Sequence, residues 1–451
     1  MASRLLAAAL LVASALLAWL VIASALAARV LQGIIGLSVV YVGFLAYRGW
    51  QLIRASLAAG SIAPEEPDRT PSALPFISVV VPAHNEAPVI ADVVGDLLAQ
   101  RYGSPPAPSF EVVVLDPGSD DGTGAIAAEA AALAAANIGA PAEMFRVLGG
   151  ELMAGTTTKG AALGRAMPHL RGSTVAVVDA DARVAPDFLA RVVAAWSGDP
   201  GAAAIQARRQ PMNADYSWLT AAQAEEQLMD LASQCGRRQS DGTAELRGNG
   251  MFVRRDVLDR VGGWNPRAIT EDLDLSTRLA ASGEHIALAP EVAVGEEAVT
   301  TLADLWTQRM RLAEGSLRRL MEHGPGLLAG SAPLARKLDF LAFTGEFLIP
   351  PIFATSIVAS LITIPLPIRM DWTIPISLFA AYGLGSFLLA LAGLSGMGIR
   401  GTSLLGRSLR GALFLSHWLV VVPAALLRIA VGPETTTFRK TPRMGHASAG
   451  R

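Results

Sequence analysis

The acidic residues of this chain are confined to its middle, and this distribution limits what the chain can fold into. Residues 1–53 contain no Asp or Glu, and only three of the 39 acidic residues follow residue 340, namely Glu346, Asp371 and Glu434. Hydrophobic residues make up 52% of the 451 residues and charged residues only 17%, against about 25% charged residues in ordinary soluble domains. One water-soluble domain is therefore expected between two apolar ends.

The N-terminal end contains two uncharged runs, Leu5–Ala28 and Val30–Tyr47. At about 1.5 Å per residue, each run is long enough to cross a hydrocarbon core of about 30 Å. The first run has an alternative interpretation as a cleaved signal peptide, since Ala25-Leu26-Ala27 has the small-x-small pattern of a cleavage site. With either interpretation the second run ends on the cytoplasmic side, where Arg48 and Arg54 agree with the positive-inside rule.

The C-terminal end contains three uncharged runs, Phe347–Ile368, Trp372–Ile399 and Gly411–Leu427. Three full crossings would place the tail outside, but the tail and the 400–410 loop are both basic, which favours the cytoplasm. Either one run is re-entrant or interfacial, or one long run contains two passes. The sequence leaves the number of crossings open.

These patterns divide the chain into six segments. They are two transmembrane helices (1–53), a linker (54–75), a soluble domain (76–300), an amphipathic interfacial segment (301–340), a transmembrane region of three to four segments (341–432) and a basic tail (433–451). The formal net charge of −2 provides no basic surplus for nucleic acid, so no nucleic-acid partner is expected. Cys235 is the single cysteine, which excludes an intrachain disulfide and a cysteine-based zinc site.

The soluble domain alternates short apolar runs with helical patterns. Buried strands are predicted at Phe76–Val81, Phe110–Leu115, Phe145–Leu148 and Thr174–Val178. This alternation predicts an α/β fold with a mostly parallel, Rossmann-like sheet and helices on both faces. Ligands bind such sheets beyond the carboxyl ends of the strands. The chain has three polar clusters at those positions: His84-Asn85-Glu86, Asp116–Thr123 and Asp179-Ala180-Asp181.

Asp179 and Asp181 follow a buried strand at positions i and i+2. Two such carboxylates can share a hard divalent cation and so hold a diphosphate through oxygen ligands. Taken alone, each cluster also has a plainer interpretation. Aspartates are common in turns and caps at strand ends, Asp116–Thr123 also fits an ordinary Asp/Gly turn, and His84 also fits a loop histidine.

Two further motifs occur in the second half of the chain. Thr270-Glu-Asp begins a predicted helix, in which Thr270 fits the N-cap and Glu271 and Asp272 fit the first turn. A carboxylate at this helix start, facing the cation site, could instead act as a general base on a hydroxyl group. Gln308-Arg-Met-Arg lies on an amphipathic segment, where its plainer interpretation is an interfacial helix whose arginines reach lipid headgroups.

The combination of these motifs resembles a known family. In chain order they are PAHNE (82–86), DPGSDDGT (116–123), KGAAL (159–163), DAD (179–181), GNGMFVRR (248–255), TED (270–272) and QRMR (308–311). Together they resemble the membrane-integrated family 2 glycosyltransferases, which include cellulose, chitin and hyaluronan synthases and lipid glucosyltransferases. The resemblance covers about residues 76–320, together with the apolar runs before and after this region.

The resemblance implies a GT-A fold for residues 76–300, a nucleotide-sugar donor, with UDP expected as the nucleotide, and a divalent cation, Mg²⁺ or Mn²⁺. It assigns the donor-binding residues as a group. Pro82, His84, Glu86 and Asp116 would hold uracil and ribose, Lys159 would lie near the donor, Asp179 would contact the nucleotide, and Gln308, Arg309 and Arg311 would bind the pyrophosphate. Asp181, with Asp179, would coordinate the cation.

On the acceptor side, the resemblance makes Asp272 the base that deprotonates the acceptor hydroxyl, with Thr270 and Glu271 shaping the acceptor pocket. A single displacement at the anomeric carbon inverts it and gives a β-linkage from an α-linked donor. Leu312 stands where the family has a Trp that supports an acceptor sugar, which favours a lipid acceptor over a growing glycan. Pro117 and Gly164 also depart from the family pattern, replacing an Asp and an Asn.

The sequence therefore predicts an inverting, metal-dependent glycosyltransferase of the cytoplasmic membrane whose catalytic domain faces the cytoplasm. A lipid acceptor is preferred, and the sugar is not specified. Two alternatives stay open: a processive polysaccharide synthase that extrudes a β-linked glycan, and a catalytically silent membrane scaffold that binds a nucleotide. The presence of Asp116, Asp179, Asp181 and Asp272 favours an enzyme over the scaffold.

Overall fold

The computed structural model describes residues 2–60, 74–104, 107–138, 142–363 and 373–432. They separate into two compact units. The described residues within 55–221 and 244–300 form the first, here called the sheet unit, and those within 1–54, 222–243 and 301–435 form the second, here called the helical unit. Residues 61–73 of the predicted linker and the whole predicted tail (433–451) lie outside the described residues.

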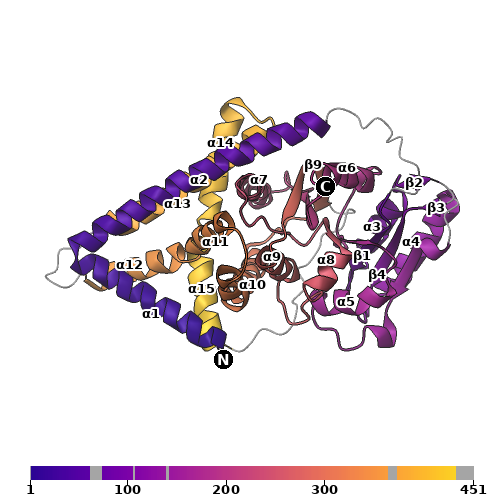
Figure 1. The fold of residues 1–451 in the computed structure, drawn as a ribbon, viewed down its shortest axis with the longest axis horizontal. Helices are drawn as coiled ribbons and strands as arrows, with labels where there is room; N and C mark the ends of the chain where they lie inside the picture. The colour runs from indigo at the N-terminus through magenta and orange to yellow at the C-terminus, as the bar shows by residue number, and fades with distance from the viewer. Residues whose placement is uncertain (1, 61–73, 105–106, 139–141, 364–372, 433–451) are drawn as a thin grey trace. The chain divides into compact units, whose positions relative to one another are not determined.

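The sheet unit is built on seven strands in the order β5-β4-β1-β6-β8-β7-β9 (Figure 1). They are β1 (Ile77–Pro82), β4 (Phe110–Leu115), β5 (Phe145–Leu148), β6 (Thr174–Val177), β7 (Ala204–Pro211), β8 (Met251–Arg254) and β9 (Ile286–Glu296). β8 runs antiparallel to β6 and β7, and the other four neighbouring pairs are parallel. β2 (Gly103–Ser104) and β3 (Ala107–Pro108) form a separate short hairpin. The predicted mostly parallel α/β sheet is confirmed.

Helices cover both faces of this sheet, as predicted. One face packs against α3 (Ile90–Leu98), α4 (Thr123–Ile138) and α6 (Phe188–Ser197). The other packs against α5 (Lys159–Ala166), α8 (Arg255–Arg260) and α9 (Glu271–Ala281). Single 3₁₀ turns occur at Ala142–Met144, Gly150–Leu152 and Met167–His169.

The central strand β1 shows why these strands are continuously apolar. Val79 and Val81 pack with α3, α4 and α6, while Val80 packs on the opposite face with α5. Successive side chains of a strand point to opposite faces, so a strand with helices on both faces needs apolar residues at every position. β4 and β5 have the predicted bounds, β1 is shifted by one residue at both ends, and β6 ends one residue earlier than predicted.

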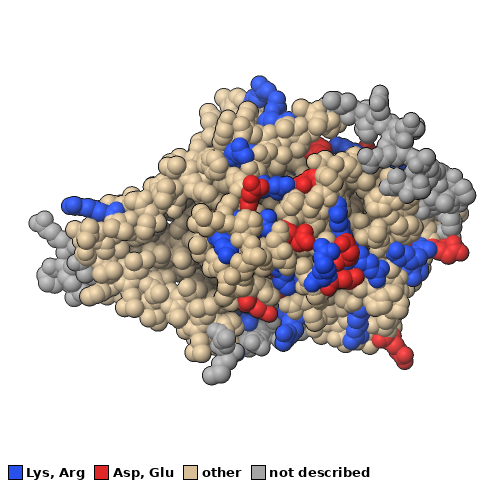
Figure 2. Space-filling model, in the orientation of Figure 1, with Lys and Arg blue, Asp and Glu red and all other residues tan. Residues whose placement is uncertain are grey.

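The helical unit consists of helices from both ends of the chain and one helix inserted from its middle. They are α1 (Ala2–Ala23), α2 (Ala25–Gly60), α7 (Trp218–Gln239), α10 (Leu302–Ala329), α11 (Leu334–Glu346), α12 (Ile349–Thr363), α13 (Thr373–Gly396), α14 (Gly401–Leu415) and α15 (Trp418–Val431). Five described stretches are long and apolar enough to cross a membrane: Ser3–Val21, Ala25–Gly60, Leu334–Ile362, Ile374–Gly396 and Gly401–Val431. The surface over α1, α12 and α13 is mostly uncharged (Figure 2).

Several helix ends differ from the prediction. The first two helices separate at Ser24 rather than at Arg29, because the Ser24 hydroxyl accepts a hydrogen bond from Ala27 N and caps α2. α2 continues to Gly60, beyond the predicted boundary at residue 53. The expected 400–410 loop is instead helical in α14, and the run Gly411–Leu427 is divided between α14 and α15.

α7 was not expected to belong with the apolar helices, because it lies between two motifs of the soluble domain. Its backbone is in close contact with α2 and α13. A methyl group on Gly49 would stand 1.9 Å from Ala232 O, and one on Gly393 would stand 2.1 Å from Leu228 O. Only glycine permits these approaches, so α7 from residue 222 onward is packed inside the helical unit.

Buried ion pairs reinforce the packing of α7. The fully buried Glu225 binds Arg407 (Nε to Oε1, 2.9 Å) and Arg410 (Nε to Oε2, 2.7 Å) of α14. Because these two arginines have a buried partner, the basic 400–410 segment forms an amphipathic helix rather than a loop. Further along α7, the buried Arg237 binds Asp339 of α11 (Nε to Oδ2, 3.1 Å).

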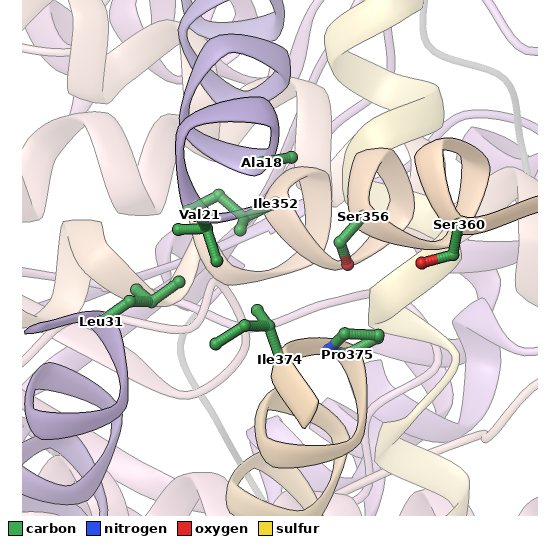
Figure 3. A pocket seen from close by; sticks show the side chains of 8 residues that line it. All are labelled: Ala18, Val21, Leu31, Ile352, Ser356, Ser360, Ile374 and Pro375. Carbon is green, nitrogen blue, oxygen red and sulfur yellow. The ribbon is translucent and has the colours of Figure 1, made fainter. Parts of the chain in front are cut away.

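The helical unit also contains a small apolar pocket (Figure 3). It is lined by Ala18, Val21, Leu31, Ile352, Ser356, Ser360, Ile374 and Pro375. Among the described lining residues the two serines are the polar ones, and Ser356 Oγ donates a hydrogen bond to Phe353 O at 2.8 Å. None of the described lining residues is titratable.

Candidate active site

Four hydrogen bonds join the end of the PAHNE loop and the following Ala87 to the DPGSDDGT turn after β4. Asn85 is central to this contact, because its N donates to Ser119 Oγ (2.9 Å) and its Oδ1 accepts from Asp120 N (3.0 Å). The other two run from Glu86 N to Thr123 Oγ1 (2.8 Å) and from Ala87 N to Asp121 Oδ2 (3.0 Å). The structure therefore brings these two predicted clusters together, and it shows a connecting role for Asn85, to which the sequence analysis gave no role of its own within the first cluster.

Asp116 also stabilises its own turn. Its Oδ1 accepts hydrogen bonds from Gly118 N (3.1 Å), Ser119 N (2.8 Å) and Ser119 Oγ (2.7 Å). The plainer interpretation of this segment as an Asp/Gly turn is thus correct for the local backbone.

In the PAHNE loop, His84 is exposed and Pro82 and Glu86 are half-buried. Their roles in binding uracil and ribose stay predictions.

The two aspartates of the DAD motif follow β6, the neighbour of β1, so they lie at the same edge of the sheet as the PAHNE loop. Asp179 N donates to Asn249 Oδ1 (3.1 Å). Asp181 is buried, and its Oδ2 accepts a hydrogen bond from Glu297 N (3.1 Å), just after β9. The backbone of Asp179 is therefore anchored to the loop before β8, and the carboxylate of Asp181 to the segment just after β9.

Lys159, the first residue of α5, connects the DAD and TED motifs. Its Nζ lies 2.7 Å from Asp179 Oδ1 and 3.2 Å from Glu271 Oε1. Burial alone would lower the pKa of this ammonium, but the carboxylates of Asp179 and Glu271 hold that pKa above its ordinary value. Lys159 is therefore charged and shared by two carboxylates that the sequence analysis assigned to the donor and acceptor sides.

Asp272, the predicted base, lies beside this ion pair. Burial and the neighbouring Glu271 raise its pKa from 3.8 to about 6, against the opposing effect of Lys159 and Arg247. A base with a pKa near the working pH is favoured in proton transfer. Thr270 occupies the N-cap of α9, but in the described part of the chain its side chain makes no capping hydrogen bond, contrary to the local expectation.

The GNG motif before β8 supports this cluster in a way that the sequence did not reveal. Gly248 has a positive φ of 78°, and a methyl group there would stand 3.2 Å from Asp272 Oδ2. Gln206 of β7 holds the loop, since its Nε2 donates to Asn249 O (2.7 Å) and its Oε1 accepts from Arg247 N (2.7 Å). The positive φ and the close approach together explain the glycine at position 248.

A second ion pair lies at the end of β9. Arg209 donates to both carboxylate oxygens of Glu296, at 2.7 and 2.5 Å. Burial would raise the pKa of Glu296, but Arg209 holds it below its ordinary value. Asn249 Nδ2 also donates to Glu296 (3.4 Å), so this pair orients the amide that receives Asp179 N. No sequence pattern singled out Gln206, Arg209 or Glu296, because strands distant in the chain bring them together.

The QRMR motif lies on α10, in the helical unit. Gln308, Arg309, Arg311 and Leu312 are all half-buried. Arg309 forms an ion pair with Glu226 of α7, and its guanidinium lies 5.6 Å from the centre of the Trp418 ring. Trp418 Nε1 donates to the same Glu226 carboxylate (3.0 Å). Arg309 thus has a structural partner, and the binding of pyrophosphate by this motif stays a prediction.

The donor set at Asp179 and Asp181 fits a hard divalent cation. Both residues offer carboxylate oxygens, and an ammonium group already lies on Asp179, so this position favours positive charge. Among the residues that the structure describes, no group of three or more Asp, Glu, His or Cys is arranged to hold a metal ion. A cation with two protein carboxylates takes further oxygen ligands from phosphate, as Mg²⁺ does in nucleotide sites.

Comparison with known proteins shows the family to which this chain belongs. Residues 75–315 match the family model described as "Glycosyltransferase like family 2". This chain belongs to the family 2 glycosyltransferases, and it is an enzyme of that class. A beta-monoglucosyldiacylglycerol synthase of Trichormus variabilis is 34% identical over 382 residues, which cover 82% of this chain and 77% of the relative. The enzyme of the same description from Synechocystis sp. is 32% identical over 413 residues, covering 87% of this chain and 82% of the relative.

The fold also agrees with a solved structure. The mannosyltransferase PcManGT from Pyrobaculum calidifontis, determined in complex with GDP-Man and Mn²⁺, superposes with a TM-score of 0.54 at 20% sequence identity. The match covers 89% of this chain and 100% of that protein. The sheet unit is therefore GT-A-like, as the resemblance implied, with apolar helices before and after it in the chain.

Proposed function

We propose that this protein is an inverting, divalent-metal-dependent glycosyltransferase that transfers one sugar from a nucleotide-sugar to a diacylglycerol-type lipid in the cytoplasmic membrane. The observation that carries the proposal is the connection of the DAD and TED carboxylates through one ammonium group, Lys159. Because of this connection, one site contains both the DAD carboxylates, where a cation can bind, and the Asp272 carboxylate, which is suited to accept a proton.

The donor side of the site would neutralise the leaving group. Asp179 and Asp181 would hold Mg²⁺ or Mn²⁺, which would offset the charge that develops on the departing diphosphate. The PAHNE loop and the turn at Asp116 would bind uracil and ribose, with Lys159 nearby. Gln308, Arg309 and Arg311 would bind the pyrophosphate. UDP is the proposed nucleotide, supplied from the cytoplasm.

On the acceptor side, Asp272 would accept the proton of the acceptor hydroxyl as its oxygen attacks the anomeric carbon. Attack from the face opposite the leaving diphosphate inverts that carbon, so an α-linked donor gives a β-linked product. Thr270 and Glu271 would shape the acceptor pocket. The relatives' descriptions favour glucose as the sugar and diacylglycerol as the acceptor. Leu312, where a Trp would support a growing glycan, favours a single transfer.

The proposal is tested with membranes that contain the full chain and diacylglycerol. Labelled UDP-glucose, UDP-galactose or UDP-N-acetylglucosamine is supplied with Mn²⁺ or Mg²⁺, and the product is divided into lipid-extractable and polymer fractions. We expect label from UDP-glucose in the lipid fraction, abolished by a chelator and restored by added cation. Label in the polymer fraction would instead support the processive synthase and reject the lipid acceptor.

Two variants complete this test. Asp272→Asn removes the proposed base and should lower the transfer rate by about 100- to 10,000-fold. Asp256→Asn is the matched control, since Asp256 is an exposed acidic residue in the first turn of α8 that pairs with Arg260. It should transfer as the unaltered protein does. UDP binding without transfer from any donor would favour the nucleotide-binding scaffold instead.

A further inference from the structure

Lys159 contacts carboxylates on both the donor side and the acceptor side of the site. Its single ammonium group binds Asp179, which follows β6, and Glu271, which begins α9. The lysine side chain is 19% exposed, so few water molecules compete for these contacts. An ammonium group has three donors, which allows it to bind both carboxylates at once or to favour either one.

The backbone of Lys159 is fixed, so any change of partner would involve only its side chain. Thr158 caps α5, accepting from Ala161 N (3.0 Å), and its hydroxyl donates to Pro266 O (2.8 Å). A methyl group on Gly160 would stand 2.5 Å from Asn265 O. The start of α5 is therefore in tight contact with the segment that leads into α9.

Asp272 lies within reach of the same ammonium group. A methyl group on Gly248 would stand 3.2 Å from Asp272 Oδ2 and 3.8 Å from Lys159 Nζ, so both atoms flank one glycine. The charged groups that face Asp272 are Lys159 from α5, Arg247 from the loop before β8, and Glu271 from α9 itself. Lys159 also binds Asp179 of the DAD motif.

We propose that Lys159 is a positioning residue that acts as the counter-ion of Asp179 until a divalent cation binds there, and then as the counter-ion of Glu271 and Asp272. A divalent cation held by Asp179 repels the ammonium group, and Glu271 keeps that group within the site. The charge of Lys159 then favours the ionised form of Asp272. The base is thus prepared for the acceptor only after the donor side is occupied.

This inference deepens the proposed function and rests on it, but its main test does not need transfer. Binding of Mn²⁺ alone to the full chain in detergent micelles is measured by electron paramagnetic resonance titration. Lys159→Met removes the competing charge, so we expect this variant to bind Mn²⁺ several-fold more tightly than the unaltered protein. Lys159→Arg keeps the charge and should bind Mn²⁺ as the unaltered protein does. Lys337→Met is the matched control: Lys337 is a half-buried lysine of α11 in the helical unit that donates to Gly330 O, and its loss should leave Mn²⁺ binding unchanged.

The second readout is the pH dependence of the transfer rate. The acidic limb of the rate profile should move to higher pH in Lys159→Met, because Asp272 loses the cation that favours its ionised form. Lys159→Arg should keep the original limb. Thermal unfolding of each variant confirms that it is folded.

Each outcome decides the inference. Tighter Mn²⁺ binding together with a shifted acidic limb supports it. Unchanged or weaker Mn²⁺ binding by Lys159→Met, or an unmoved limb, overturns it and leaves Lys159 as a purely structural link between α5 and α9. If the unaltered protein transfers no sugar from any donor, the proposed function fails, whereas the Mn²⁺ titration still tests whether Lys159 competes for Asp179.

Discussion

The helical unit and the candidate active site of the sheet unit both bury charged residues, but they balance the charges differently. In the helical unit, Arg237 is matched by Asp339, and Glu225 is matched by Arg407 and Arg410. In the sheet unit, Asp179 and Glu271 share the single ammonium of Lys159, while Asp272 beside them holds its proton to a higher pH than usual.

The matched charges of the helical unit support the fold, whereas the charges around Lys159 prepare a reaction. Breaking a matched buried pair leaves one charge without compensation and is costly to stability. A site with surplus negative charge is instead unfavourable until a cation or a proton arrives. Variants of the matched pairs in the helical unit should therefore lose stability, whereas charge variants in the cluster around Lys159 should change activity while the protein stays folded.

The largest expected effect is at the Arg237–Asp339 pair. Arg237→Met should destabilise the helical unit by about 3–5 kcal/mol, because Asp339 is left as a buried and uncompensated carboxylate. The measurement is thermal unfolding in detergent. The matched double variant Arg237→Met/Asp339→Asn removes both charges and should recover part of the loss. Equal stability of the single variant and the unaltered protein would contradict the comparison.

The next effect concerns Asp272, where activity and stability should have opposite pH dependences. Its pKa in the folded protein is raised to about 6, so between pH 4 and 6 the folded state holds a proton that the unfolded chain has released. Stability should therefore fall as the pH rises through this window, by at most about 3 kcal/mol, while the transfer rate rises. Thermal unfolding and initial rates are measured from pH 4 to 8.

Asp272→Asn provides the control for this prediction. Without a titrating group at position 272, the fall in stability across this window should become smaller. If stability rises with pH in both proteins to the same extent, Asp272 does not hold its proton as described.

A smaller effect is expected at Gly248. Gly248→Ala introduces a methyl group at a positive φ, which costs about 1–2 kcal/mol, and places it 3.2 Å from Asp272 Oδ2. The transfer rate should fall more than the stability does, because the methyl group displaces the proposed base. Gly262→Ala is the matched control, since Gly262 also has a positive φ but no atom within 4 Å of the added methyl group. Similar rates in the two variants would contradict the prediction.

The smallest expected effect is a difference in stability between alanine variants of two threonines, Thr158 and Thr270, which both occupy helix N-caps. Thr158→Ala removes a capping hydrogen bond and should cost about 1 kcal/mol of stability. Thr270 makes no capping hydrogen bond with its side chain, so Thr270→Ala should cost less. A change of KM for the acceptor in Thr270→Ala with little loss of stability would support its proposed role in the acceptor pocket. Thermal unfolding and KM are measured for both.

The sequence predicted the sheet unit well because its signals are local. The apolar runs of β4 and β5 give their bounds directly, and parallel strands bring the ends of β1, β4 and β6 to one edge. The PAHNE loop and the DPGSDDGT turn were therefore expected to meet, and their hydrogen bonds confirm it. The ion pairs of Lys159 join two further predicted motifs.

The remaining features depend on contacts between distant parts of the chain, which local patterns do not encode. Glu225 precedes its partners Arg407 and Arg410 by more than 180 residues, so its burial was not predictable from its own surroundings. Gln206 and Glu296 act through strands that pair only in the folded sheet. Thr270 lies at a helix start, as its sequence context predicted, but its side chain makes no capping contact.

The position of α7 in the chain has a practical consequence for anyone dissecting this enzyme. Residues 222–243 interrupt the sheet unit in sequence, yet they pack through Gly49 and Gly393 into the apolar helices. Removing both ends of the protein would therefore not release a soluble enzyme. The fragment would still carry α7, stripped of the helices that cover it and with Glu225 and Arg237 deprived of their counter-ions. A water-soluble version requires redesign of the α7 surface as well as truncation.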